Sequence, residues 1–312
     1  MAKIESDDPV AQKIPFSRDL DFEYGVSDQV APAVRRVIAR NPGPFTLYGT
    51  GTYIVGTGSV AVIDPGPDMS EHFDALMAEL EGEKVTHIVI THTHSDHSPL
   101  SRRLADATGG LICGHGGILP SQGVDGVGIP RMEEAVDRAL VFDVTLSDGD
   151  LIEGEGWTLE AVHTPGHIAD HICYGFREQN ILFSGDHVMG WSTSVVVPPD
   201  GSMVDYMASL ETLLGRSESV YWPTHGPAIT EPIPFVKAYI AHRLDRERQI
   251  FGQLKAGPQK ISDMVAVLYA DVAKELHPAA GQSVYAQLIK MVDEGRVSCD
   301  APPTVESLYA LK

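Results

Sequence analysis

The chain has 312 residues, 43% of them hydrophobic and 21% charged, which is the composition of an ordinary globular protein with one large domain or two unequal ones. The net charge is −20, but residues 231–312 contain ten Lys or Arg and ten Asp or Glu, so the whole excess of acid precedes them. This distribution argues against broad, non-specific nucleic-acid binding, which relies on a basic surface.

No apolar run approaches the roughly 20 residues that a membrane-spanning helix needs. The first residues carry acids where a secretory signal has basic and apolar segments, so we expect a cytoplasmic protein without membrane contact. The cysteines Cys113, Cys173 and Cys299 are widely separated and form no CxxC pair. Neither a disulfide framework nor a thiolate zinc site is therefore expected.

In chain order, residues 1–44 predict an irregular or strand-like leader. Apolar runs separated by glycine turns predict strands and helices in the following order: strands at 45–48, 52–55 and 60–64, a helix at 70–80, a strand at 85–90, a helix at 98–107 and a strand at 111–113. After a loop-rich stretch at 114–150, the pattern predicts strands at 151–152, 157–162, 171–174 and 181–183, an amphipathic helix at 203–214 and a strand at 219–222. This order fits two sheets packed face to face with helices outside.

From residue 233 the sequence becomes helical. A long charged helix is predicted at 235–254, followed by shorter helices at 261–270, near 273 and at 281–294, and by a Glu-Gly-Arg-Val turn. Short helices that close on such a turn resemble a winged-helix module. We therefore expect two domains, residues 1–232 and 233–312.

The strand predicted at 85–90 leads directly into Thr-His-Thr-His-Ser-Asp-His at residues 91–97. Imidazole nitrogens and carboxylate oxygens are ligands that a divalent metal such as Zn²⁺ prefers. A polar surface turn would explain one histidine there. Three imidazoles and a carboxylate within six residues indicate a metal site instead.

Three more polar turns each follow a predicted apolar strand. They are His-Thr-Pro-Gly-His at 163–167, Ser-Gly-Asp-His at 184–187 and Pro-Thr-His-Gly at 223–226. Each contains a glycine, which lets the backbone bend sharply enough to present a ligand. Because strand ends on one edge of a sandwich converge, we expect all four turns to meet over one site.

Together, over about residues 40–230, these motifs resemble the metal motifs of the metallo-β-lactamase superfamily. The resemblance implies an α+β fold, a four-layer αββα sandwich. Carried over position by position, it implies that one metal is held by His92, His94 and His163, that the other is held by Asp96, His97 and His225, and that Asp186 bridges both. Asp64 matches a carboxylate that orients the ligands from outside, and His167 is expected beside the His163 turn in a structural role.

The resemblance also implies two divalent ions as cofactors, Zn²⁺ first, with Mn or Fe as alternatives. Such a pair, roughly 3.5–4 Å apart, would activate a bridging water as hydroxide. Asp96 would orient this nucleophile or accept the proton that the water loses. Two departures separate the branches of the superfamily. Common β-lactamases have a cysteine in place of Asp186, and flavodiiron proteins have a glutamate in place of His94. The remaining ligand set resembles glyoxalase II, lactonases and ribonuclease Z-like hydrolases.

The tail, with residues 190–195 and 205–210, resembles the β-lactamase-like protein 2 subgroup. Ser192, Thr193 and Ser194 are candidates for a substrate contact. The acidic first part favours an ester, thioester or lactone substrate, whereas the subgroup resemblance favours single-stranded RNA and endoribonuclease activity. An iron persulfide dioxygenase and a DNA-binding module are the further alternatives. We expect the tail to shape the substrate cleft or a homodimer contact.

Overall fold

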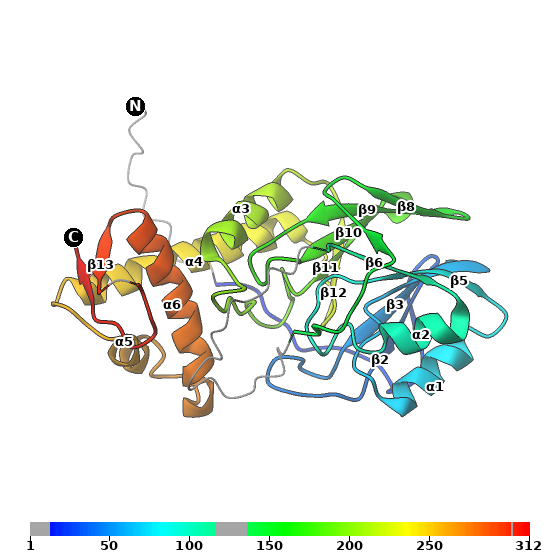
Figure 1. Cartoon of the computed structure of the whole chain (residues 1–312), viewed down its shortest axis with the longest axis horizontal. Helices are drawn as coiled ribbons and strands as arrows, with labels where there is room; N and C mark the ends of the chain where they lie inside the picture. The colour runs from blue at the N-terminus through cyan, green and yellow to red at the C-terminus, as the bar shows by residue number, and fades with distance from the viewer. Residues whose placement is uncertain (1–12, 117–135, 301) are drawn as a thin grey trace. The chain divides into compact units, whose positions relative to one another are not determined.

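The computed structural model describes residues 13–116, 136–300 and 302–312, so the loop-rich stretch predicted at 114–150 lies partly outside the described residues. The chain forms two compact units (Figure 1). The larger unit is Phe16–Pro232, and the smaller unit is Ile233–Lys312 together with residues 13–15.

The larger unit contains two β-sheets. In spatial order, the seven-stranded sheet consists of β1 (Asp28–Ala31), β2 (Val34–Ile38), β3 (Gly51–Thr57), β4 (Ser59–Ile63), β5 (Lys84–Val89), β6 (Leu111–Gly114) and β7 (Val144–Thr145). The five-stranded sheet consists of β12 (Val220–Pro223), β11 (Ile181–Gly185), β10 (Ile172–Phe176), β9 (Trp157–His163) and β8 (Leu151–Gly154). Strands β4 to β7 are parallel, as are β11 and β12, and the other neighbours are antiparallel.

Both faces of the seven-stranded sheet are buried, because alternate residues of its central strands are apolar on both sides. Tyr53 of β3 packs towards Phe183 of the other sheet. Its neighbour Ile54 faces the opposite way, in a cluster that includes Leu76 of α1 (Ser70–Glu79) and Leu104 of α2 (Ser101–Thr108). The helix α3 (Met203–Leu214) lies over the five-stranded sheet (Figure 1). The predicted αββα sandwich is therefore confirmed.

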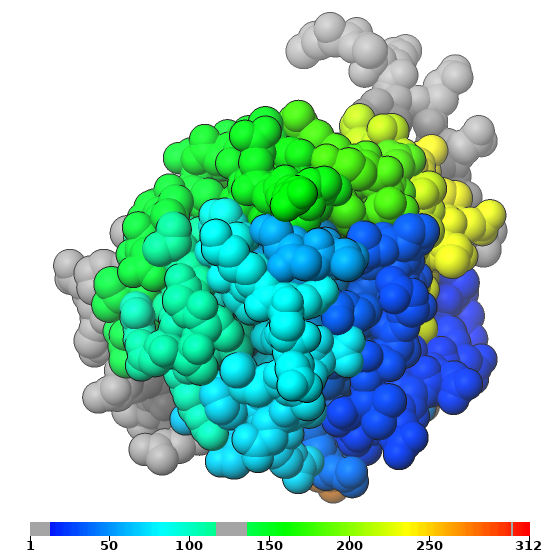
Figure 2. Space-filling view, turned by 90° about the vertical axis from the view of Figure 1, so that its right-hand side faces the viewer, coloured from blue at the N-terminus to red at the C-terminus, as the bar shows by residue number. Residues whose placement is uncertain are grey.

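The sandwich brings polar turns to one end of the strands. The turns that follow β4, β5, β11 and β12 all leave the carboxyl ends of parallel strands, where loops of such sheets gather. Figure 2 shows a face of the larger unit on which the first half of its chain, in blue to cyan, lies against the second half, in green. One predicted strand is wrong: residues 45–48 form turns, and Leu47 has a positive φ of 57°, which is unusual for a residue with a branched side chain and does not belong to the β region.

The smaller unit consists of helices and one hairpin. Its elements are α4 (Pro232–Leu254), α5 (Ile261–Leu268), the 3₁₀ turn Lys274–Leu276, α6 (His277–Asp293), β13 (Val297–Cys299) and β14 (Tyr309–Leu311). Met264, Leu288 and Met291 are fully buried in its own core. Beside that core, Nζ of Lys290 lies 2.8 Å from a carboxylate oxygen of Glu247. Across the described parts of the chain, none of the helices combines the length and apolarity that crossing a bilayer demands.

Candidate metal centre

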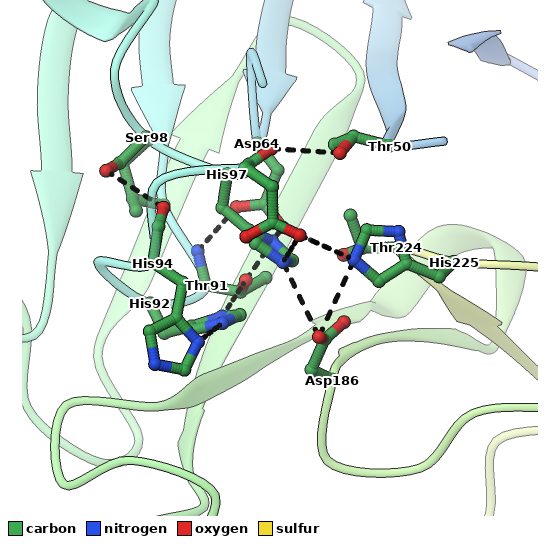
Figure 3. A network of polar contacts seen from close by, with 12 residues as sticks. Thr50, Asp64, Thr91, His92, His94, His97, Ser98, Asp186, Thr224 and His225 are labelled. Carbon is green, nitrogen blue, oxygen red and sulfur yellow. Dashed lines mark hydrogen bonds and ion pairs between the residues drawn. The ribbon is translucent and has the colours of Figure 1, made fainter. Parts of the chain in front are cut away.

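Asp64 connects the turns that carry the candidate ligands. Its carboxylate accepts hydrogen bonds from the amide of Thr91 (2.8 Å), the hydroxyl of Thr91 (2.7 Å), the hydroxyl of Thr224 (2.9 Å) and Nδ1 of His97 (2.9 Å). Asp64 is fully buried and has a φ of +48°, an unusual backbone conformation for a residue with a side chain. One carboxylate thus ties together the turns after β4, β5 and β12 (Figure 3).

The first group of ligand atoms comes from three histidines. Nε2 of His92 lies 2.9 Å from Nδ1 of His94, and Nε2 of His167 lies 3.0 Å from the same Nδ1. The outer nitrogens of two rings are engaged elsewhere: Nδ1 of His92 with the hydroxyl of Thr91 (3.1 Å), and Nδ1 of His167 with the carbonyl oxygen of Val195 (2.6 Å). Such outer hydrogen bonds fix the tautomer and leave the inner nitrogen's lone pair for a metal.

The second group consists of Asp96, His97 and His225. Oδ2 of Asp96 lies 3.1 Å from Nε2 of His225 and 3.6 Å from Nε2 of His97. The outer nitrogen of His225, Nδ1, lies 3.1 Å from the carbonyl oxygen of Gly49, and that of His97 faces Asp64. Both rings are fully buried, and with their outer nitrogens engaged each ring turns its Nε2 towards Asp96.

Asp186 lies close to members of both groups, and Figure 3 shows it facing His97 and His225. Its Oδ2 is 3.6 Å from Nε2 of both His97 and His225, and 4.0 Å from Nε2 of His167. The triplets His92–His94–His167, His92–His97–Asp186 and Asp96–His97–His225 each bring three ligand atoms within 4.8 Å of one another. Asp186 thus lies within 4.0 Å of a ring nitrogen of each group.

Burial and mutual proximity shift the titration of these groups. Burial and the neighbouring His167 lower the pKa of His94 to about 3, and burial with neighbouring imidazoles holds the pKa of His92 well below its usual value. Burial opposes ionisation of Asp96, but His97 and His225 outweigh it and lower the pKa of Asp96 to about 2. The histidines of the first group are therefore neutral at pH 7, while the second group carries one ionised carboxylate, that of Asp96.

The donor set fits divalent metal ions. Nε2 of His97, Nε2 of His225 and Oδ1 of Asp186 are buried without a hydrogen-bond partner among the described residues. Leaving such atoms unpartnered costs about 1–3 kcal/mol each, and more for charged groups. Imidazole nitrogens with carboxylate oxygens are what Zn²⁺, Mn²⁺ and Fe²⁺ accept, so bound cations would compensate for this cost.

His163 is not part of either group, unlike the expectation from the sequence. Its ring stacks on His115 with centroids 4.0 Å apart, and its Nε2 lies 3.2 Å from the carbonyl oxygen of Ala169. His163 is the last residue of β9, and its side chain stays half-buried at the end of that strand. The turn that follows, with Gly166 at a φ of +137°, carries His167 inward instead. A side chain at Gly166 would collide with the backbone of Tyr206, since a Cβ there would lie 2.2 Å from its Cα.

The predicted substrate loop also differs in one residue. Ser194 is buried, and its hydroxyl lies within hydrogen-bond distance of the carbonyl oxygens of Asp186 and His187. It thus braces the turn that presents Asp186 rather than facing a substrate. Ser192 and Thr193 are half-buried.

Comparison with known proteins agrees with this architecture. Residues 46–225 match the metallo-beta-lactamase superfamily, and residues 261–301 match the beta-lactamase associated winged helix domain. The sandwich and its histidine-aspartate centre are those of this class of metal-dependent hydrolases, and the chain belongs to the metallo-β-lactamase superfamily.

Among curated relatives, the beta-lactamase-like protein 2 homolog of Caenorhabditis elegans is 34% identical over 275 residues, 86% of this chain and 88% of the relative. An atrochrysone carboxyl ACP thioesterase of Aspergillus novofumigatus is 31% identical over 263 residues, 78% of this chain and 73% of the relative. The resemblance of the sequence to the β-lactamase-like protein 2 subgroup is thus confirmed.

Among solved structures, a beta-lactamase domain protein from Burkholderia ambifaria has a TM-score of 0.77 at 20% identity, covering 94% of this chain and 96% of its own. A metallo-beta-lactamase family protein from Thermus thermophilus has a TM-score of 0.74 at 22% identity, covering 91% of this chain and 100% of its own. At these identities the likeness establishes the fold.

Proposed function

We propose that the protein is a binuclear metal-dependent hydrolase that cleaves thioesters, with esters and lactones as related substrates. The observation that carries the proposal is the position of Asp186 between two groups of ligand atoms. In this proposal His92, His94 and His167 hold one divalent cation. Asp96, His97 and His225 hold the other, and Asp186 contacts both.

When bound, divalent cations at such a site lower the pKa of a water towards neutrality and polarise a substrate carbonyl. The chain's own contribution is orientation. The Asp96 side chain is 13% exposed and therefore not sealed from solvent. Because its pKa is about 2, Asp96 is ionised at neutral pH and accepts a hydrogen bond from the attacking water, which orients it. Its Oδ2 lies 3.1 Å from Nε2 of His225, with which it would share the cation.

One observation and one chemical argument support a thioester as the substrate. Relatives named as acyl carrier protein thioesterases align with about three quarters of this chain or more. In addition, a thiolate leaves more readily than an alkoxide, because thiols are much stronger acids than alcohols. The chemistry therefore needs no separate acid to protonate the leaving group. The acidic charge of residues 1–230 is unfavourable for the polyanion RNA.

The test is an activity panel with zinc-loaded protein: acyl thioesters, acyl esters, lactones, a phosphodiester and single-stranded RNA. We expect thioester hydrolysis to exceed the other activities, and Asp186→Ala to lower it at least about 100-fold with loss of bound metal. Asp68→Ala, at an exposed aspartate, is the matched control and should behave as wild type.

Hydrolysis of RNA alone would replace the thioester assignment with an endoribonuclease. One iron per chain together with oxygen consumption would replace the hydrolase with a dioxygenase. Unchanged metal content and hydrolysis in Asp186→Ala would contradict the binuclear centre itself.

A further inference from the structure

Behind Asp186, a chain of buried polar groups leaves the turn at one residue and returns to it at another. The amide of Asp186 donates to Nε2 of His171 (3.1 Å), and Nδ1 of His171 lies 2.9 Å from Oγ1 of Thr164. That hydroxyl lies 3.2 Å from Sγ of Cys173, which lies 3.5 Å from the carbonyl oxygen of Ser184. The two ends of the chain are thus two residues apart.

Both ends fix the direction in which the protons point. A backbone amide only donates, so Nε2 of His171 must accept and the proton of the neutral ring must be on Nδ1. Nδ1–H then donates to Thr164. A carbonyl oxygen only accepts, so the thiol of Cys173 donates to Ser184, and the Thr164 hydroxyl is left to donate to sulfur. Every member acts once as donor and once as acceptor.

The local structure is built to hold this arrangement. The side chains of His171, Thr164 and Cys173 are fully buried. His171 directly precedes β10 and Cys173 is the second residue of that strand, so the two side chains, two residues apart in extended chain, point to the same face. Gly185 has a φ of +52°, and a Cβ there would lie 2.5 Å from Nε2 of His171. Glycine at this position therefore lets the ring approach the turn.

Burial also keeps the end of the chain in the required state. It raises the pKa of the Cys173 thiol to about 12, so the sulfur keeps its proton at neutral pH. The same burial makes oxidation or alkylation at Cys173 slow, because the thiolate is the reactive form. Cys173 is thus more than an apolar core residue, because its sulfur has a hydrogen-bond partner on each side, Thr164 and Ser184.

We propose that His171, Thr164 and Cys173 form a one-directional hydrogen-bond relay that positions the Ser184–Asp186 turn, and that His171 acts in it as the neutral Nδ1–H tautomer. These are positioning residues, since none of them is placed to touch a substrate. The effect on metal binding rests on the proposed role of Asp186 as a ligand, whereas the tautomer does not.

The tautomer is tested directly by NMR on metal-free protein labelled with ¹⁵N in its imidazoles. The His171 signals are assigned by their absence from His171→Gln. We expect a protonated Nδ1 and an unprotonated Nε2. A proton on Nε2, or on both nitrogens at neutral pH, would overturn the relay whatever the enzyme hydrolyses.

The positioning effect is tested with matched substitutions and a zinc titration against a competing chelator. His171→Gln can place its amide oxygen near the position of Nε2 and so keep the acceptor for the Asp186 amide, but it loses the donor to Thr164, so its zinc affinity should lie between those of wild type and His171→Leu. His171→Leu fills similar space without an acceptor, and its affinity should fall about 10- to 100-fold, as is usual when partners of metal ligands are lost. Equal zinc affinity in Leu, Gln and wild-type proteins would contradict positioning.

Should His171→Leu fail to fold, the far end of the relay carries the test. Cys173→Ser keeps a donor and an acceptor, whereas Cys173→Ala removes both, so the alanine variant should lose more zinc affinity than the serine variant. Thermal unfolding of the metal-free forms serves as the second readout. If the relay positions the Asp186 turn, Cys173→Ala lowers zinc affinity by more than its change in stability explains, and a drop in stability alone would refute the relay.

Discussion

Nδ1 of His97 lies 2.9 Å from Oδ2 of Asp64, and both side chains are fully buried. This contact turns the opposite nitrogen of His97 towards Asp96 and Asp186. The same carboxylate holds Thr91 and Thr224, so one residue sets the mutual position of turns from both sheets. Its removal should therefore be felt at the ligands even though it contributes no ligand atom in the proposed centre.

Asp64→Asn tests that role. The amide keeps the volume of the carboxylate but loses one acceptor oxygen, so it cannot serve Thr91, Thr224 and His97 together. We expect zinc affinity to fall about 10- to 100-fold, measured by competitive titration. Asp68→Asn, at an exposed site, is the control. Wild-type affinity in Asp64→Asn would show that the carboxylate is dispensable for the ligand geometry.

The two histidines of the His-Thr-Pro-Gly-His turn provide a matched pair. In our proposal His167 holds a metal and His163 does not, because only His167 points an inner nitrogen at His94. His167→Ala should lose about one metal ion per chain by elemental analysis, together with most hydrolysis. His163→Ala should keep its metal content and lose only the stacking on His115. The reverse outcome would restore the assignment made from the sequence.

Stability should fall in mild acid through His72. This side chain is 1% exposed, its Nε2 lies 2.9 Å from Oγ1 of Thr52, and burial lowers its pKa from 6.5 to about 4. Below pH 6.5 the unfolded chain binds a proton at this position that the folded chain refuses until about pH 4, so stability decreases as the pH falls through that window. At pH 5 the loss amounts to about 2 kcal/mol.

Urea unfolding of the metal-free protein at pH 7 and pH 5 measures this effect. Because burial also lowers the pKa of His92 and His94, these histidines destabilise the folded chain in mild acid too, and the informative quantity is the comparison with His72→Gln. The variant cannot take up that proton, so its loss of stability between the two pH values should be smaller by about 2 kcal/mol. An equal loss in both proteins would mean that His72 is accessible to protons in the folded chain.

Metal removal should lower thermal stability as well as abolish hydrolysis. An ion that binds only the folded state adds about 2.7 kcal/mol when its concentration is a hundred times its dissociation constant. Dialysis against a chelator should therefore lower the Tm, and Zn²⁺, Mn²⁺ or Fe²⁺ added singly should raise it again to an extent that ranks them. Asp186→Ala, measured beside it, should respond less to each ion. A Tm that ignores every metal would argue against the centre.

Much of this architecture follows from sequence pattern. The helix predicted at 203–214 has the same bounds as α3, because its apolar residues recur at helical spacing and Ser202 caps its first turn. The residues His92 to His97 lie together because a short turn leaves them little freedom. Their assignment to two groups came only from the resemblance of the motifs, because local sequence pattern does not say which ring nitrogen faces inward.

Other features depend on contacts between distant residues. His163 and His167 occur in one motif, and choosing between them requires knowing that β9 ends at His163. The partners of Cys173 come from Thr164 and Ser184, which approach it only once β9, β10 and β11 have paired. Residues 45–48 have the composition of a strand. The chain turns there instead, because the carbonyl oxygen of Asn41 accepts a hydrogen bond from the Thr46 hydroxyl and its side chain accepts one from the amide of Thr50. These two hydrogen bonds of Asn41 favour the turn over the strand that the composition predicts.

The ligand atoms come from both sheets: His92 to His97 follow a strand of one, and Asp186 and His225 follow strands of the other. Ions held between them would cross-link the two sheets of the sandwich. Local opening on one side would then require releasing metal on the other, so the two halves should exchange their amide hydrogens as one block when loaded and as two when empty. The same ions that prepare a water for attack would also decide whether this part of the chain unfolds in one step or in two.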